Sequence, residues 1–169
     1  MHRDIKLDNI GLVAVQPPQA VLLDFGHATR AKSSTNHMRG TVRYLAPEVL
    51  ALKEDAGSAP YTNQVDTWAL GVCLYEVFRE SFIRWKAVNE SHYRNLREGL
   101  TDELTSPADR YEDHDAVQSL MLVMLRSIVW DPLKRLSARH GLLALGGEDG
   151  QGKQEGRDPA VGTKRRQDD

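Results

Sequence analysis

The chain has 169 residues, and its 22 basic and 24 acidic side chains leave a formal charge of −2. This length suits one folded domain, and a content of 40% hydrophobic and 27% charged residues is that of an ordinary globular protein. The near-neutral balance excludes a general nucleic-acid-binding protein, which would carry a basic surplus. The longest apolar stretches, such as 120–125, are too short to cross a bilayer. We therefore expect neither a nucleic-acid partner nor a membrane partner.

The single cysteine, Cys73, excludes a disulfide within the chain and a cluster of thiolate metal ligands. A lone cysteine in an apolar segment is typical of a small buried side chain. The first residues lack the charged-then-apolar pattern of a secretion signal. The expected location is intracellular, in the cytoplasm, the nucleus or both.

The first third of the sequence predicts short strands and loops. The apolar runs Ile10–Val15 and Ala20–Leu23 flank a proline-containing turn at 16–19, which is the pattern of a β-hairpin. The polar stretch Ala31–Arg39 has no periodicity and is predicted to be a loop.

The rest of the domain is predicted to be helical, so the expected fold class is mainly α. Apolar side chains cover nearly every face of Gln64–Phe78, which indicates a buried helix. A shorter helix is expected from Pro132 to about Leu145, and 89–99 is a weaker candidate. Another helix is predicted from apolar residues spaced by three and four: Val117, Leu120, Met121, Met124, Leu125 and Ile128.

The composition changes after Leu145. Residues 146–169 are rich in Gly, Gln and charge and hold almost no large apolar side chain, so they cannot bury enough surface to offset the entropy of ordering. We expect a folded domain over 1–145 and a disordered C-terminal tail over 146–169.

The most informative string is the octapeptide His2–Asn9. It holds a carboxylate, a lysine two positions later and an asparagine five positions later, and a backbone that loops back would bring Asp4, Lys6 and Asn9 together. Asp24 stands at the end of the predicted hairpin, which could return a second carboxylate to the same place. Two oxygen donors beside a phosphate suit Mg²⁺, which takes few protein ligands and keeps several waters.

These residues belong to an ordered set of motifs that resembles the eukaryotic protein kinases of the serine/threonine type. The three central motifs are His2-Arg3-Asp4, Asp24-Phe25-Gly26 and Ala46-Pro47-Glu48. The other motifs are Gly40-Thr41 with Tyr44, Asp66-x-Trp68-x-x-Gly71 and Asp131-Pro132-x-x-Arg135. The resemblance implies a part of the kinase C-lobe, made of a short β-hairpin, an activation segment and helices.

The resemblance also implies roles for the clustered polar residues. Asp4 would orient the substrate hydroxyl and accept its proton, and Lys6 would neutralise charge on the transferred phosphoryl group. Asn9 and Asp24 would hold the Mg²⁺ ions that bridge the phosphates of ATP. Lys6 together with Thr41 is similar to the pattern of kinases that phosphorylate serine or threonine of a protein substrate.

Arg3, directly before Asp4, resembles kinases whose activation segment is ordered by a phosphate. The candidate phosphorylation sites are Ser33, Ser34 and Thr35. The alternative is that these three residues are simply polar side chains of a loop, without a regulatory role.

The remaining matches are structural. Glu48 and Arg135 would form a buried ion pair, and Asp66 would accept backbone N–H groups from the His2-Arg3 turn. His2 and Phe25 would stack against each other, with Gly26 completing the triplet.

The chain also departs from the family pattern. It starts one residue before the catalytic loop, and no G-x-G-x-x-G motif or strand lysine is found in it. Two readings follow: part of a serine/threonine kinase, expected to have negligible activity as an isolated chain, or a non-catalytic module that competes for the partners of a kinase. The sequence leaves the protein substrate, the activator and the oligomeric state open.

Overall fold

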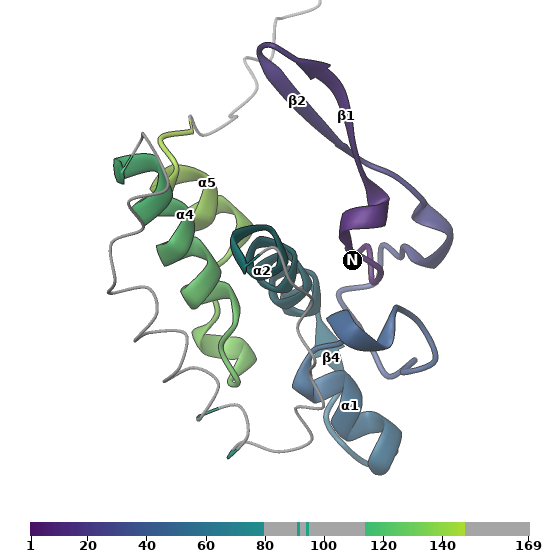
Figure 1. The fold of residues 1–169 in the computed structure, drawn as a ribbon. Helices are drawn as coiled ribbons and strands as arrows, with labels where there is room; N and C mark the ends of the chain where they lie inside the picture. Colours follow the sequence, from purple (N-terminus) through teal and green to yellow (C-terminus); the bar gives the residue numbers. More distant parts are fainter. Residues whose placement is uncertain (80–90, 92–93, 95–113, 148–169) are drawn as a thin grey trace, which may run out of the picture.

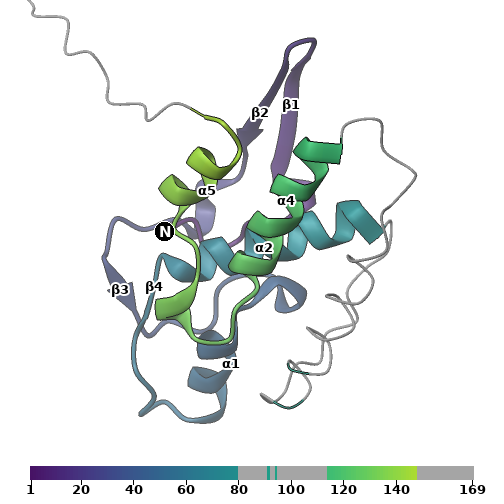
Figure 2. The same cartoon turned by 90° about the vertical axis from the view of Figure 1, so that its left-hand side faces the viewer.

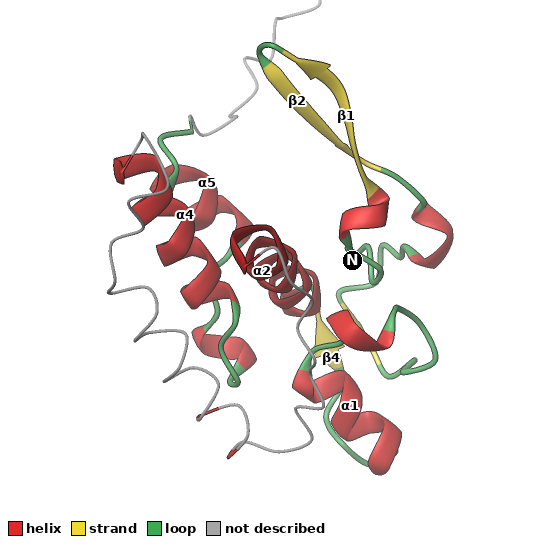
Figure 3. Cartoon of the chain, in the orientation of Figure 1, coloured by secondary structure: helices red, strands yellow, loops and turns green. Residues whose placement is uncertain are grey.

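The computed structural model describes residues 1–79, 91, 94 and 114–147. The weak helix expected over 89–99, apart from residues 91 and 94, and all but the first two residues of the expected tail lie outside these ranges. The described helices are α1 (Pro47–Glu54), α2 (Gln64–Arg79), α4 (His114–Ser127) and α5 (Ala138–Ala144). The described strands form two small antiparallel pairs, β1 (Ile10–Val15) with β2 (Pro18–Leu22) and β3 (Ser33–Ser34) with β4 (Tyr61–Thr62) (Figure 3).

Helix α2 lies at the centre of the described structure. Helices α4 and α5 lie on one side of it, and α1 and the N-terminal segment lie on the other (Figures 1 and 2). Its side chains Val65, Trp68 and Val72 are all buried, as expected for a helix that is apolar on most faces. They join one core with side chains from α1, α4 and the segment before α1, among them Val49, Leu52, Met124, Ile128, Tyr44 and Ala46.

Gly71 permits the close approach of α2 and α4. A Cβ atom at this position would lie 2.7 Å from Ile128 Cγ1 and 2.8 Å from Ser127 Cβ, both on or beside α4. Any larger residue would force the two helices apart, which explains why the buried helix carries a glycine despite its low helix propensity.

The predicted β-hairpin is confirmed, although its turn is shorter than expected. Only Gln16 and Pro17 separate the strands, and the peptide bond between them is cis. The register shifts between Leu12 and Ala14, which marks a bulge. The hairpin extends away from α2 (Figure 1), and its apolar side chains Leu12 and Val13 are exposed.

Two sequence predictions need correction. The stretch 31–39 is not wholly a loop, because Ser33–Ser34 pairs with Tyr61–Thr62 as a short strand. The last helix is not continuous from Pro132. A 3₁₀ turn, Pro132–Lys134, comes first, and α5 begins only after Ser137, whose side chain accepts the His140 N–H as an N-cap.

Helix α1 was not predicted from the sequence. It has only eight residues, too few for a periodicity to show. Pro47 occupies its first turn, where a missing N–H costs nothing, and Val49 and Leu52 face the core.

A buried ion pair joins α1 to the turn that precedes α5. The guanidinium of Arg135 donates two hydrogen bonds to the Glu48 carboxylate, at 2.6 and 2.7 Å. The side chain of Arg135 is fully buried, and its other donors reach the carbonyls of Val129, Gln64 and Trp130. The guanidinium also lies 5.0 Å from the ring centroid of Trp68. Every donor direction of this cation is therefore occupied, as a buried charge requires.

Among the described helices, none combines the length and the apolar character needed to span a membrane.

Replacing Arg135 with Met leaves the largely buried Glu48 carboxylate, whose side chain is 16% exposed, without its cation. We expect the free energy of unfolding to fall by about 3–5 kcal/mol, measured by urea denaturation followed by circular dichroism. The matched control is Lys134→Met at the neighbouring position, where the side chain is 77% exposed and, within the described residues, forms an ion pair with Asp131 alone. This control should cost less than about 1 kcal/mol. Equal losses in the two variants would contradict the importance of the buried pair.

Candidate active site

The site begins with a backbone turn that is anchored to α2. The N–H groups of His2 and Arg3 donate to the two oxygens of the Asp66 carboxylate, each at 2.7 Å. Arg3 has φ 70°, in the left-handed region that non-glycine residues rarely adopt. Asp66 lies in the first turn of the buried helix, so its two charge-assisted hydrogen bonds hold this turn against a rigid element. The next residue, Asp4, is placed by that turn.

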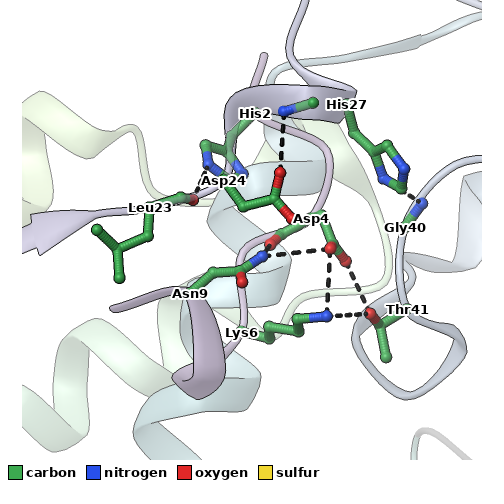
Figure 4. Close-up of polar contacts among 10 residues, drawn as sticks. His2, Asp4, Lys6, Asn9, Leu23, Asp24, His27, Gly40 and Thr41 are labelled. Atoms are coloured by element: carbon green, nitrogen blue, oxygen red, sulfur yellow. Dashed lines mark hydrogen bonds and ion pairs between the residues drawn. The ribbon is translucent and has the colours of Figure 1, made fainter. Parts of the chain in front are cut away.

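Three side chains converge on the Asp4 carboxylate (Figure 4). Thr41 Oγ1 donates to Asp4 Oδ1 at 2.8 Å, and Lys6 Nζ lies 3.3 Å from Asp4 Oδ2. Lys6 Nζ also donates to Thr41 Oγ1 at 3.1 Å, which closes a triangle of contacts. Asn9 Nδ2 donates to Asp4 Oδ2 at 3.2 Å and to the Asp4 backbone carbonyl at 2.9 Å. The loop that the sequence requires for Asp4, Lys6 and Asn9 to meet is therefore present.

Two opposing effects set the pKa of Asp4. Burial raises the pKa of this carboxyl, but the hydrogen bonds from Thr41 and Lys6 and the charge of Lys6 outweigh burial and hold the pKa below its ordinary value of 3.8. The group is therefore a carboxylate at neutral pH, partly shielded from water and beside a cation. Such a carboxylate can orient a hydroxyl group and accept its proton.

Asp24 and Asn9 supply the oxygen atoms expected for a metal. Asp24 lies directly before the 3₁₀ turn Phe25–His27 in the left-handed conformation, with φ 54°, and its Oδ1 accepts the Gly26 N–H at 3.1 Å. The amide nitrogen of Asn9 faces Asp4, so its amide oxygen points the other way (Figure 4). Hard oxygen donors of this kind suit Mg²⁺ completed by water and phosphate oxygens. No cluster of three or more His, Cys, Asp or Glu side chains exists among the described residues, so a cage made wholly of protein ligands is not available there.

His2 and Phe25 are in contact, but only one of them is buried. Their ring centroids lie 5.0 Å apart at an interplanar angle of 66°, an edge-to-face arrangement. His2 is 7% exposed and its Nε2 lies 3.1 Å from the Leu23 carbonyl, whereas Phe25 is 62% exposed. The pair therefore stands at the edge of the core, with Phe25 facing outward.

The candidate regulatory residues do not meet in this structure. Arg3 Nε donates to the His27 carbonyl, at 2.5 Å. Ser33 and Ser34 lie in β3, and the Ser34 hydroxyl accepts the Asn36 N–H at 3.1 Å. Ser33 and Thr35 are exposed.

Sequence reasoning missed a buried carboxylate on α2. Glu76 is 4% exposed, accepts a hydrogen bond of 2.7 Å from the Tyr44 hydroxyl and lies 3.2 Å from Arg43 Nε. Burial, followed by the hydrogen bond and charge of Glu76, raises the pKa of Tyr44 far above its usual value. An acidic residue within a helix that is otherwise apolar was the available signal. Nearby, burial raises the pKa of the Cys73 thiol to about 12, in accord with a buried, unreactive cysteine.

His27 is a second residue that sequence reasoning missed. Its ring Nδ1 accepts the backbone N–H of Gly40 at 3.3 Å (Figure 4). Its place directly after the Asp24-Phe25-Gly26 motif was the only signal for it.

Replacing Thr41 with Val removes one of the hydrogen bonds that lower the pKa of Asp4, so the pKa should rise. A depressed carboxyl pKa contributes stability that is present above the unfolded-state value and is lost as the pH falls through the folded-state value. In the variant the contribution of Asp4 to stability should be smaller, and its loss should be complete at a higher pH. Carboxyl ¹³C NMR of Asp4 across an acid titration measures the shift, with exposed Thr35→Val as the control. An unchanged Asp4 titration in the Thr41 variant would contradict the geometry.

Comparison with known proteins gives one family. Residues 1–144 match the family model described as the protein kinase domain. The liver/testis isoform of the phosphorylase b kinase gamma catalytic chain from Bos taurus is 32% identical over 145 residues, which cover 84% of this chain and 34% of the relative. Serine/threonine-protein kinase ULK3 from Xenopus laevis is 32% identical over 139 residues, which cover 80% of this chain and 27% of the relative. The cAMP-dependent protein kinase catalytic subunit 2 from Drosophila melanogaster is 40% identical over 76 residues, which cover 45% of this chain and 19% of the relative.

The chain spans about a third or less of the length of these curated relatives. The family model, in contrast, covers most of the chain, from residue 1 to residue 144. Together with the ordered motifs, this match shows that the chain belongs to the protein kinase family.

Proposed function

We propose that this chain is the catalytic-loop and activation-segment part of a serine/threonine protein kinase, which transfers the γ-phosphoryl group of ATP to a protein hydroxyl. The observation that carries the proposal is the closed set of contacts among Asp4, Lys6 and Thr41, with distances of 2.8 to 3.3 Å. A carboxylate, a cation and a hydroxyl that meet at one point provide a proton acceptor, a partner for a phosphate and a fixed floor for the incoming hydroxyl.

Each residue has a distinct task in the proposed reaction. The Asp4 carboxylate orients the substrate hydroxyl and accepts its proton as the oxygen attacks phosphorus. Lys6 Nζ, held by Asp4 and Thr41, would neutralise the negative charge that develops on the phosphoryl oxygens. Because such a reaction is accelerated chiefly by alignment and charge stabilisation, fixed positions matter more than unusual reactivity.

The nucleotide and the metal fit the residues that are present. Asn9 and Asp24 would hold Mg²⁺ through their side-chain oxygens, and the ion would neutralise charge on the phosphates of ATP. Burial and two hydrogen bonds to Asp4 fix the Asn9 side chain, so its ligand oxygen is preoriented. The left-handed backbone at Asp24 and its bond to the Gly26 N–H likewise fix the second ligand.

Arg3 supports a regulatory role for the activation segment, residues 24–48. Only its Nε is used by a contact within the described residues, so its terminal nitrogens offer a fork for a phosphate. We propose Ser33, Ser34 or Thr35 as the phosphorylated residue. Its phosphate would pair with Arg3 and fix the segment that carries Thr41.

Helix α2 is buried, and its carboxylates Asp66 and Glu76 hold the His2-Arg3 turn and the Val42–Tyr44 turn. These features support the assignment of residues 1–145 to the C-lobe of the kinase fold. Since residues 1–169 include no Gly-rich loop and no strand lysine, we propose that they transfer little phosphate on their own. An intracellular location accords with the use of ATP as phosphoryl donor.

Phosphoryl transfer by the natural polypeptide that carries these residues tests the proposal. With Mg²⁺, radiolabelled ATP and a degenerate serine/threonine peptide library, we expect label on serine or threonine. Asp4→Asn should lower the rate by about a hundredfold or more, because it removes the proton acceptor while keeping the shape. Asp55→Asn, an exposed substitution beyond the end of α1, should leave the rate unchanged.

Label on tyrosine alone would overturn the substrate class. No label, or equal rates in the wild type and the Asp4 variant, would favour the alternative of a non-catalytic module that competes for the partners of a kinase.

A further inference from the structure

His27 contacts two segments that lie far apart in the sequence. Its backbone carbonyl accepts a hydrogen bond of 2.5 Å from Arg3 Nε. Its ring Nδ1 accepts one of 3.3 Å from the backbone N–H of Gly40, as Figure 4 shows. A backbone N–H can only donate, so Nδ1 carries no proton in this arrangement. One residue thus links the catalytic loop at Arg3 with the far end of the activation segment.

Gly40 is held tightly at the same point. Its φ of 92° lies in the left-handed region, and a Cβ atom there would lie 2.7 Å from the Arg3 carbonyl oxygen and 2.9 Å from Leu45 Cδ2. The backbone at Gly40 therefore packs directly on the backbone of the catalytic loop, where only glycine fits. The bond from its N–H to His27 fixes the remaining freedom of this peptide group.

The residue after Gly40 is Thr41, whose hydroxyl completes the proposed site. Thr41 Oγ1 donates to Asp4 at 2.8 Å and accepts from Lys6 at 3.1 Å. The side chain of Thr41 makes no capping bond to the 3₁₀ turn Val42–Tyr44, although its backbone carbonyl accepts the Tyr44 N–H at 2.9 Å. The backbone that carries the Thr41 hydroxyl is therefore held on both sides, by Tyr44 after it and by the bond of the Gly40 N–H to His27 before it.

We propose that His27 is a positioning residue for phosphoryl transfer, acting through Gly40 and Thr41 on Asp4. The inference rests on the proposed kinase function and deepens it. His27 touches neither the phosphates nor the incoming hydroxyl. Its imidazole holds the peptide before Thr41 so that the threonine hydroxyl meets the catalytic carboxylate. Loss of the Nδ1 acceptor lets Thr41 move away, which lowers the rate of the chemical step and leaves ATP binding intact.

Two substitutions at His27 separate the acceptor from the shape of the side chain. His27→Asn places an amide oxygen close to the position of Nδ1 and so keeps a hydrogen-bond acceptor there. His27→Leu keeps a side chain of similar size but removes the acceptor. His37→Leu is the matched control, because His37 lies in the same segment and has no hydrogen bond among the described contacts.

The first readout is independent of activity. In the natural polypeptide that carries residues 1–169, amide hydrogen exchange at Gly40 should be slow in the wild type, in His27→Asn and in His37→Leu. It should become fast in His27→Leu. Slow exchange at Gly40 in the leucine variant would overturn the proposed contact.

The second readout is phosphoryl transfer to the serine/threonine library. We expect His27→Leu to lower kcat by roughly two- to tenfold, the effect of losing one neutral hydrogen bond, with an unchanged KM for ATP. His27→Asn should restore kcat, which a merely structural role would not predict.

The two proposals fail in different ways. Equal kcat values in the wild type and His27→Leu, with a strong loss in Asp4→Asn, would overturn the role of His27 alone. No transfer by the wild type would overturn the kinase function, and the role of His27 with it, whatever the exchange at Gly40 shows.

Discussion

The Asp66 carboxylate determines where the catalytic loop stands. Both of its oxygens accept backbone N–H groups at 2.7 Å, from His2 and Arg3, and the second of these residues is in a left-handed conformation. Such a conformation costs free energy and persists only where the surroundings fix it. A carboxylate on the first turn of a buried helix provides that constraint, because it has two acceptors and a rigid base. Asp4 is placed one residue beyond this anchor.

The same helix also holds the other half of the site. Glu76, near the far end of α2, accepts a hydrogen bond from Tyr44 and pairs with Arg43, three and two residues after Thr41. Asp66 therefore fixes the segment with Asp4, and Glu76 fixes the segment with Thr41. Since both carboxylates project from one rigid element, the 2.8 Å contact between Thr41 and Asp4 follows from the packing of α2.

A third carboxylate stabilises the frame around this pair. Glu48 lies in the first turn of α1, at the end of the activation segment, and its bond to the buried Arg135 connects α1 to the turn before α5. The guanidinium of Arg135 also lies over the ring of Trp68 on α2. The activation segment thus ends on a fixed point at Glu48. The proposed phosphorylation of Ser33, Ser34 or Thr35 would act between this point and Asp24.

The sequence predicted the parts of this structure that depend on motif and periodicity. The buried helix was identified from its apolar faces, and the hairpin from two apolar runs around Pro17. Convergence of Asp4, Lys6 and Asn9 was expected from their spacing, and the structure shows the loop that this requires. The contacts of His27 and Glu76 were not predicted, because each depends on a residue more than ten positions away. Helix α1 and strand β3 were missed because they are too short to have a period of their own.

The central proposal is that Asn9 and Asp24 hold a metal ion beside Asp4 and Lys6, where the terminal phosphate of ATP would bind. Mn²⁺, a paramagnetic substitute for Mg²⁺, tests it most directly when added with ATP to the isotope-labelled protein. The account predicts that the NMR signals of Asn9 and Asp24 broaden first, well before those of exposed acidic residues such as Asp115, and that Asp24→Asn abolishes the effect at Asn9. Broadening that begins at Asp115 or other exposed carboxylates, with Asn9 unaffected, would contradict the claim.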